Sequence, residues 1–296
     1  MTSGAMTPDA WRAAGRTMSW RGLRVFYRDS DGDRARNREP LLLLHGFPTS
    51  SWDWAELWDD LADAYRVVAL DYVGFGFSAK PPGGPYAVFS YADQAEAVLD
   101  HLGIPHAHLL AHDLGDTVAQ ELLARDRERA TSASSRVRSV MFLNGGVFPE
   151  LHRPRAAQKL LASPVGFAVA RAMPRRLFER GLAEVFGPHT QPSRPLLDGF
   201  YQCASCDDGL HNYHRLIGYM AERPLYRDRW VATIEHPRIP TAFAIGHRDP
   251  VSGAHVAERL HAIGARVTDL PDIGHYPQCE APGAIADAYS SFRAAF

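Results

Sequence analysis

The segment from Leu109 to Thr117 constrains the fold more than any other part of this chain. An apolar run meets a small-x-Asp-x-Gly turn, and a helical pattern follows it. Ala111 and Gly115 are small enough for a strand to enter a helix without collision. Asp113 stands at the centre of the turn. The segment therefore predicts a nucleophile elbow in which the attacking group is a carboxylate.

A carboxylate nucleophile restricts the electrophile that it can usefully attack. Attack on an acyl carbon would give a high-energy anhydride, whereas attack on a saturated carbon gives a stable ester that water can later cleave. Asp113 should be ionised at neutral pH without help from a base, because the ordinary pKa of Asp is about 3.9. The elbow thus favours epoxides or alkyl halides over esters as substrates.

Short apolar runs alternate with amphipathic segments over most of the chain. This alternation predicts an α/β fold whose mostly parallel sheet carries helices on both faces. Ligands then bind at the carboxyl ends of the strands. We expect strands at 23–29, 41–45, 66–70, 107–111, 137–143, 241–246 and 266–270, and helices at 54–63, 91–102, 115–128, 255–263 and 282–295.

Residues 147–232 interrupt the alternation. This stretch is rich in Arg and Pro, contains no convincing strand, and has helix-like pieces at 155–172, 175–185 and 209–222. The sequence therefore predicts a core domain formed by 1–146 and 233–296, with an inserted helical cap domain at 147–232.

Composition excludes several classes of function. A net charge of −2 over 296 residues argues against a nucleic-acid or anionic-membrane partner. No apolar run approaches the roughly 20 residues that span a bilayer, and residues 1–8 do not resemble a signal peptide. The three cysteines, Cys203, Cys206 and Cys279, suit a reduced cytoplasmic setting. A homodimer is compatible with the sequence, which does not fix the oligomeric state.

Two backbone N–H groups are expected to form an oxyanion hole. The HGFP segment at 45–48 follows a strand, and its Gly lets the chain turn so that the Phe47 N–H points into a site. The Leu114 N–H would be the second donor. The helix N-terminus at Leu114 would also stabilise negative charge on Asp113.

An acid and a histidine follow the elbow in the chain. Asp249 comes after an apolar strand and can orient an imidazole, and His275 lies in a loop after the last predicted strand. Asp272 is a rival partner for His275. Taken alone, Asp249 could instead be the N-cap of a helix. His275 is one of fourteen histidines, most of which are expected to be solvated or structural. The order nucleophile, acid, histidine favours a catalytic triad.

These motifs resemble those of α/β-hydrolases with an Asp nucleophile, a group that includes epoxide hydrolases and haloalkane dehalogenases. The matching segments are HGFPTSSW (45–52), DYVGFGFSAKP (71–81), HDLGD (112–116), GHRDPV (246–251) and GHYPQCEAP (274–282). Four further segments look like a vertebrate branch of the same superfamily: 111–123, 144–154, 181–193 and 227–231. The resemblance implies an α/β-hydrolase fold with a helical cap, no cofactor, and a small apolar substrate with an epoxide or other alkyl electrophile that reacts with water.

The residues leave two leaving groups open, a halide and an epoxide oxygen. Dehalogenases of this group usually place Trp after the nucleophile and often Asn after the H-G pair, where this chain has Leu114 and Phe47. Epoxide hydrolases use two cap tyrosines, but His214 replaces the Tyr of the similar motif at 211–215. Residues 147–200 contain no Tyr. The remaining candidates for contact with the substrate are His45, Tyr201, Tyr213, His214 and Tyr219.

The sequence thus favours an epoxide hydrolase that uses Asp113, His275 and Asp249. A haloalkane dehalogenase-like hydrolase is the alternative with the same first step, and a non-catalytic ligand- or partner-binding protein is the alternative of another class. Cys203-x-x-Cys206 with His211 and His214 resembles a zinc set, but its spacing is shorter than usual, so incidental cysteines and no metal are expected.

Overall fold

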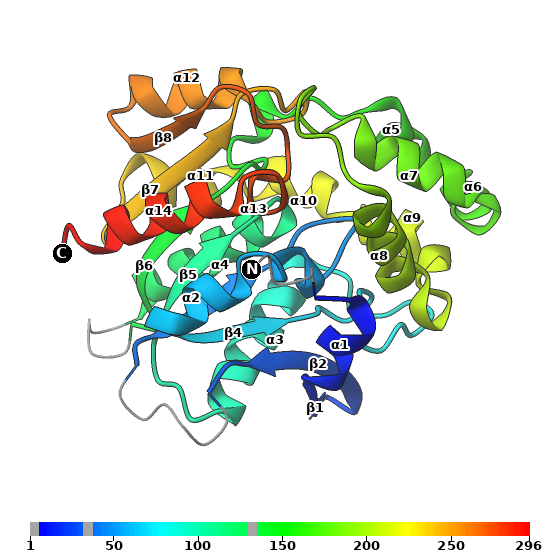
Figure 1. Ribbon diagram of the computed structural model, residues 1–296, viewed down its shortest axis with the longest axis horizontal. Coiled ribbons are helices and arrows are strands. Elements are labelled where there is room, and N and C mark those ends of the chain that lie inside the picture. Colours follow the sequence, from blue (N-terminus) through cyan, green and yellow to red (C-terminus); the bar gives the residue numbers. More distant parts are fainter. Residues whose placement is uncertain (1–5, 32–37, 130–134) are drawn as a thin grey trace.

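An eight-stranded sheet forms the centre of the structure, a computed structural model that describes residues 6–31, 38–129 and 135–296 (Figure 1). The strand order is β1-β2-β4-β3-β5-β6-β7-β8. The pairs β1–β2 and β2–β4 are antiparallel, and all later neighbours are parallel. The strands are β1 (Arg16–Trp20), β2 (Leu23–Asp29), β3 (Pro40–Leu44), β4 (Arg66–Leu70), β5 (Ala107–Ala111), β6 (Val137–Phe142), β7 (Thr241–Gly246) and β8 (Arg266–Leu270).

Helices cover both faces of this sheet (Figure 1). The central strands β3 and β5 are therefore buried almost throughout, which explains their continuous apolar sequences. The covering helices outside the β6–β7 connection include α2 (Trp58–Ala64), α3 (Val88–His101), α4 (Leu114–Glu128), α12 (Ala254–Ala262) and α14 (Pro282–Arg293). The predicted α/β-hydrolase architecture is confirmed.

Between β6 and β7 the chain forms helices, which we call the helical insert. They are η3 (Pro149–Leu151), α5 (Ala156–Leu161), α6 (Gly166–Ala172), α7 (Arg175–Ala183), α8 (Arg194–Ser205), η4 (Cys206–Asn212), α9 (Tyr213–Leu216), α10 (Tyr219–Leu225) and α11 (Arg227–Glu235). The helices α5, α6 and α7 lie to one side of the sheet (Figure 1), whereas α11 packs on α4. The division of the chain into a core domain and a cap domain stays a prediction.

Several elements differ from the sequence-based expectations. β1 was not predicted, because most of its side chains are exposed and it has no apolar run. α8 was missed as well; it begins with the N-cap Ser193 and carries Pro195 in its first turn. The short helices η1 (Ser51–Trp54), α1 (Pro8–Ala13) and α13 (Pro277–Glu280) were also not distinguished. Residues 1–5, part of the segment 1–8 considered above, lie outside the described residues.

None of the helices in the described ranges combines the length and the apolar character that crossing a bilayer requires.

The elbow joins β5 to α4 at the carboxyl end of the sheet. Asp113 has φ 51° and ψ −107°, a conformation that a non-glycine residue rarely adopts. A Cβ at Gly115 would lie 2.1 Å from the Leu44 carbonyl oxygen of the neighbouring strand. Glycine is therefore required at position 115, because the helix enters directly against β3.

This packing predicts that Gly115→Ala destabilises the protein by about 2 to 3 kcal/mol, since a buried backbone oxygen cannot move aside cheaply. Gly181→Ala is the matched control: it lies inside α7 with open space around its Cβ. That change should add about 0.5 to 1 kcal/mol, because alanine favours the helix. Urea unfolding of both variants measures the two effects, and equal midpoints would contradict the elbow packing.

Candidate active site

Three side chains from separate loops meet at the carboxyl ends of the strands. Asp113 follows β5, Asp249 follows β7, and His275 follows β8. The His275 Nδ1 atom lies 2.7 Å from Asp249 Oδ2, and its Nε2 atom lies 3.7 Å from Asp113 Oδ2. The structure thus brings together the three residues predicted as a triad, with His275 between the two carboxylates.

Asp249 is fixed by several hydrogen bonds. The Val251 N–H donates to Oδ1 at 2.7 Å, and the Ser252 hydroxyl donates to Oδ2 at 2.6 Å. The Asn144 amide donates to Oδ2 at 3.1 Å. Asp272, the rival partner for His275, instead has an exposed side chain 3.6 Å from Arg248. Asp249 is therefore the carboxylate that orients the imidazole.

The three groups strongly influence one another's ionisation. Burial alone would raise the pKa of Asp249, but His275 lowers it to about 2. Burial opposes the charge of His275, yet Asp249 and then Asp113 raise its pKa to about 9. Burial is likewise outweighed at Asp113, whose pKa is lowered by His275, Arg223 and His112. Both carboxylates are consequently ionised at neutral pH, and His275 is protonated.

The two oxygens of Asp113 have different environments. Oδ1 accepts the Phe47 N–H at 2.9 Å and the Tyr219 hydroxyl at 3.2 Å, while Oδ2 faces His275. The Phe47 N–H therefore points where the sequence predicted. Across the described ranges, no hydrogen bond joins the Leu114 N–H to Asp113, so the second oxyanion donor stays a prediction.

The other residues predicted to contact the substrate have different surroundings. His45 is fully buried; its Nδ1 bonds the Gly46 carbonyl and its Nε2 accepts the Tyr72 N–H, so it stabilises the turn, and its contact with a substrate stays a prediction. His214 bonds the His211 carbonyl through Nδ1 and does not line the cavity described below. Tyr213 lines that cavity, but its hydroxyl donates to the Pro48 carbonyl at 2.5 Å.

Among the described residues, His, Cys, Asp and Glu side chains nowhere gather in a group of three suited to a metal ion. The segment with Cys203 and Cys206 is no exception.

Two further residues at the site were missed by the sequence analysis. His112 is buried, burial lowers its pKa to about 3, and its Nε2–H donates to the His275 carbonyl at 2.8 Å, which ties the elbow to the histidine loop. The Arg223 guanidinium lies against the face of the Tyr219 ring and donates to the backbone carbonyl of Asp113 at 3.2 Å. The i, i+4 spacing of Tyr219 and Arg223 on α10 places both on one helix face. That spacing was the available signal.

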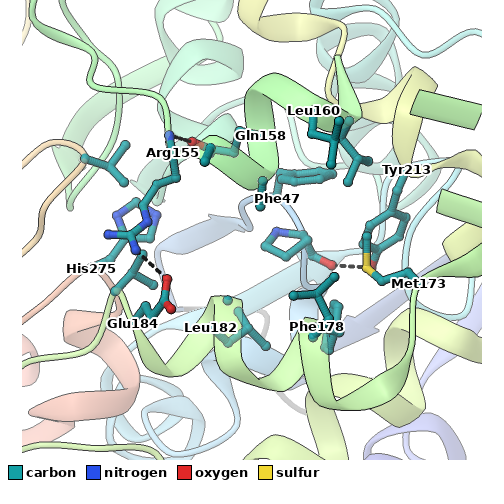
Figure 2. A pocket seen from close by; sticks show the side chains of 18 of the residues that line it. Phe47, Arg155, Gln158, Leu160, Met173, Phe178, Leu182, Glu184, Tyr213 and His275 are labelled. Carbon is teal, nitrogen blue, oxygen red and sulfur yellow. Dashed lines mark hydrogen bonds and ion pairs between the residues drawn. The ribbon is translucent and has the colours of Figure 1, made fainter. Parts of the chain in front are cut away.

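A cavity of about 210 Å³ is lined by residues of the insert together with Phe47 and His275. Figure 2 shows the side chains around it. Apolar side chains of α5, α6 and α7 line one part of it, and Phe47, Tyr213 and His275 line another. An ion pair between Arg155 and Glu184 lies at one side. Asp113 is only 2% exposed and does not line the cavity, whereas its neighbours Phe47 and His275 do. The cavity suits a small apolar molecule.

Comparisons with known proteins agree with this architecture. A family model described as alpha/beta hydrolase fold matches residues 39–282. The mesoderm-specific transcript homolog protein of Bos taurus is 40% identical over 295 residues, covering 96% of this chain and 87% of that protein. This is the vertebrate branch expected from the sequence, and that expectation is confirmed.

Two other similarities extend the comparison. The putative hydrolase LipZ of Mycobacterium tuberculosis is 35% identical over 280 residues, covering 94% of this chain and 95% of that protein. A crystal structure of a haloalkane dehalogenase variant from Bradyrhizobium elkanii superposes with a TM-score of 0.77 at 22% identity, covering 95% and 97% of the two chains. The latter likeness concerns the fold alone.

The raised pKa of His275 predicts a pH-dependent contribution to stability. Its partners stabilise the protonated ring, so this contribution is complete below about pH 6.5 and is lost as the pH rises through about 9. The difference in unfolding free energy between the unmodified protein and His275→Gln should therefore be larger at about pH 6 than at about pH 10, by on the order of 2 kcal/mol. Urea unfolding at both pH values measures this difference.

Exposed His236 offers a matched control. The same measurements on His236→Gln show how much of the effect comes from replacing any histidine by glutamine. If the difference in unfolding free energy between the unmodified protein and His275→Gln is the same at both pH values, the buried ion pair of His275 with Asp249 is contradicted.

Proposed function

Because the chain belongs to the α/β-hydrolase fold family, we propose that it is a cofactor-independent hydrolase of small apolar epoxides that acts through an ester on Asp113. One observation carries the proposal. An ionised Asp occupies the elbow, with Oδ1 held by the Phe47 N–H and Oδ2 directed at the His275–Asp249 pair. A carboxylate placed in this way is suited to attack on a saturated carbon.

In the first step, Asp113 Oδ2 attacks an epoxide carbon and the carbon–oxygen bond of the ring breaks. The resulting alkoxide needs a proton. Tyr219 carries the phenol nearest to the nucleophile, 3.2 Å from Oδ1, and it is the proton donor in this scheme. Tyr213 is less suited to that role, because its hydroxyl is engaged by the Pro48 carbonyl.

In the second step, water cleaves the ester. Alkylation removes the charge of Asp113, which is one cause of the raised pKa of His275, so the pKa of the ring falls and the ring gives its resting proton to solvent. The neutral ring can then act as a base, and it recovers that proton from solvent when Asp113 is ionised again. His275 takes a proton from water, hydroxide adds to the Asp113 carboxyl carbon, and the Phe47 N–H holds the oxyanion. His275 then protonates the departing alcohol. The proton left on the Asp113 carboxyl returns to Tyr219, so the sum is epoxide plus water to diol.

A halide is the second candidate leaving group, because the first step would be the same. Leu114 and Phe47 occupy the positions where dehalogenases carry side-chain donors to the halide. The Tyr219 hydroxyl next to Asp113 would therefore be the hydrogen-bond donor to the departing halide. Turnover of matched epoxides, alkyl halides and p-nitrophenyl esters distinguishes the candidates, and no turnover of any of them would favour a non-catalytic binding protein. A cytoplasmic location and a homodimer also stay predictions.

His275→Gln should arrest the reaction at the ester, because alkylation needs no base whereas hydrolysis does. Intact-mass analysis after addition of an epoxide should show one adduct on the peptide that contains Asp113. The double variant Asp113→Asn, His275→Gln should give none. An unlabelled His275→Gln protein would refute the alkyl-enzyme mechanism, and so would ester turnover that survives Asp113→Ala.

Tyr219→Phe should lower epoxide turnover by about 100-fold or more, because it removes the general acid. Tyr213→Phe is the matched control; it loses a hydroxyl that donates to the Pro48 carbonyl, and it should affect turnover much less. Steady-state rates with one epoxide compare the two variants. Equal losses would argue against Tyr219 as the proton donor.

A further inference from the structure

Arg223 is a buried cation that takes no part in the two chemical steps above. Its side chain is 2% exposed, and within the described residues no carboxylate oxygen lies within 4.0 Å of its guanidinium. An unpaired buried charge costs several kcal/mol unless nearby groups stabilise it. The neighbours of Arg223 therefore indicate its role.

Those neighbours belong to the elbow and to Tyr219. Nε donates to the Thr117 hydroxyl at 2.9 Å, and Nη2 donates to the Asp113 carbonyl at 3.2 Å. Nη1 lies 3.5 Å from His152 Nδ1. The Cζ atom lies 4.7 Å from the centroid of the Tyr219 ring, within the range of a cation–π contact. The Arg223 side chain of α10 thus contacts both the first turn of α4 and the ring of Tyr219.

The chain leaves space for this arrangement after β6. A Cβ at Gly146 would lie 2.3 Å from Arg223 Nη1, and a Cβ at Gly145 would lie 2.0 Å from Asp116 Oδ2. Asp116 is fully buried, and neither of its carboxyl oxygens has a hydrogen-bond partner in the described structure. Two glycines therefore accommodate a guanidinium and a second carboxyl group beside the nucleophile.

We propose that Arg223 is a positioning residue that holds the Tyr219 hydroxyl on Asp113 and supplies the positive charge that keeps the nucleophile ionised beside Asp116. The kinetic part of this proposal rests on the proposed function. The electrostatic part does not, because it concerns the protein without substrate.

The surroundings of Asp113 explain why an additional cation matters. Burial and Asp113 together raise the pKa of Asp116 well above its ordinary value, and Arg223 opposes that rise while it lowers the pKa of Asp113. The charged and titratable groups around the nucleophile are His45, Asp53, His112, Asp116, His152, Tyr219, Arg223, Asp249, His275 and Tyr276. Arg223 is the guanidinium of this set.

A substrate-free titration tests the charge. In protein labelled with ¹³C at Asp carboxyls, the Asp113 signal is identified by its loss in Asp113→Asn. Arg223→Met should raise the pKa of Asp113, whereas Arg223→Lys should keep it close to that of the unmodified protein, because the charge is retained. An unchanged pKa in Arg223→Met would overturn the electrostatic role.

Alkylation by styrene oxide in the His275→Gln background tests the positioning. Both Arg223→Met and Arg223→Lys should slow adduct formation by about 10-fold or more, because neither restores the planar contact with Tyr219. The alkylation rate falls at low pH, where Asp113 becomes protonated. The pH at which this fall occurs should be higher only in Arg223→Met. Gly146→Ala, which displaces the guanidinium without removing it, should also slow alkylation.

Arg215→Met is the matched control, since Arg215 is an exposed arginine of the same helical insert. It should leave the alkylation rate unchanged. Equal rates in His275→Gln with and without Arg223→Met would overturn the positioning role. A His275→Gln protein that styrene oxide never labels would instead refute the proposed function, and the titration would still decide the electrostatic role. Urea unfolding of each variant identifies losses caused by misfolding.

Discussion

The rest of the site depends on the ionisation of one buried carboxylate. Asp113 is 2% exposed, and burial by itself would raise its pKa. The Phe47 N–H and the Tyr219 hydroxyl stabilise Oδ1, while His275 and Arg223 supply positive charge. These groups come from the β3 turn, the helical insert and the loop after β8, so the ionised nucleophile requires distant parts of the chain to assemble correctly.

The helical insert therefore contributes more than a cover for the cavity. Its α10 helix places Tyr219 and Arg223 four residues apart on the face that meets the elbow, and apolar side chains of α5 to α7 line part of the cavity (Figure 2). The sheet supplies the triad, and the insert supplies the phenol and the guanidinium.

Much of this arrangement could be predicted from the sequence, for identifiable physical reasons. Buried parallel strands are continuous apolar runs, and the elbow needs small residues around Asp113, so both leave local signals. The choice of Asp249 over Asp272, by contrast, depends on contacts between separate loops. The buried hydrogen bonds of His45 to backbone groups likewise leave no local signal in the sequence. The contact of Arg223 with Asp113 spans 110 positions and leaves only a helical spacing as a clue.

The central claim is that an oxygen of Asp113, rather than one from water, enters the product in the first turnover. A single turnover of an epoxide with excess enzyme in ¹⁸O-labelled water measures this directly. The account predicts an unlabelled diol and one ¹⁸O atom in the peptide that contains Asp113. A labelled diol together with an unlabelled Asp113 peptide would show direct attack by water and would contradict the account.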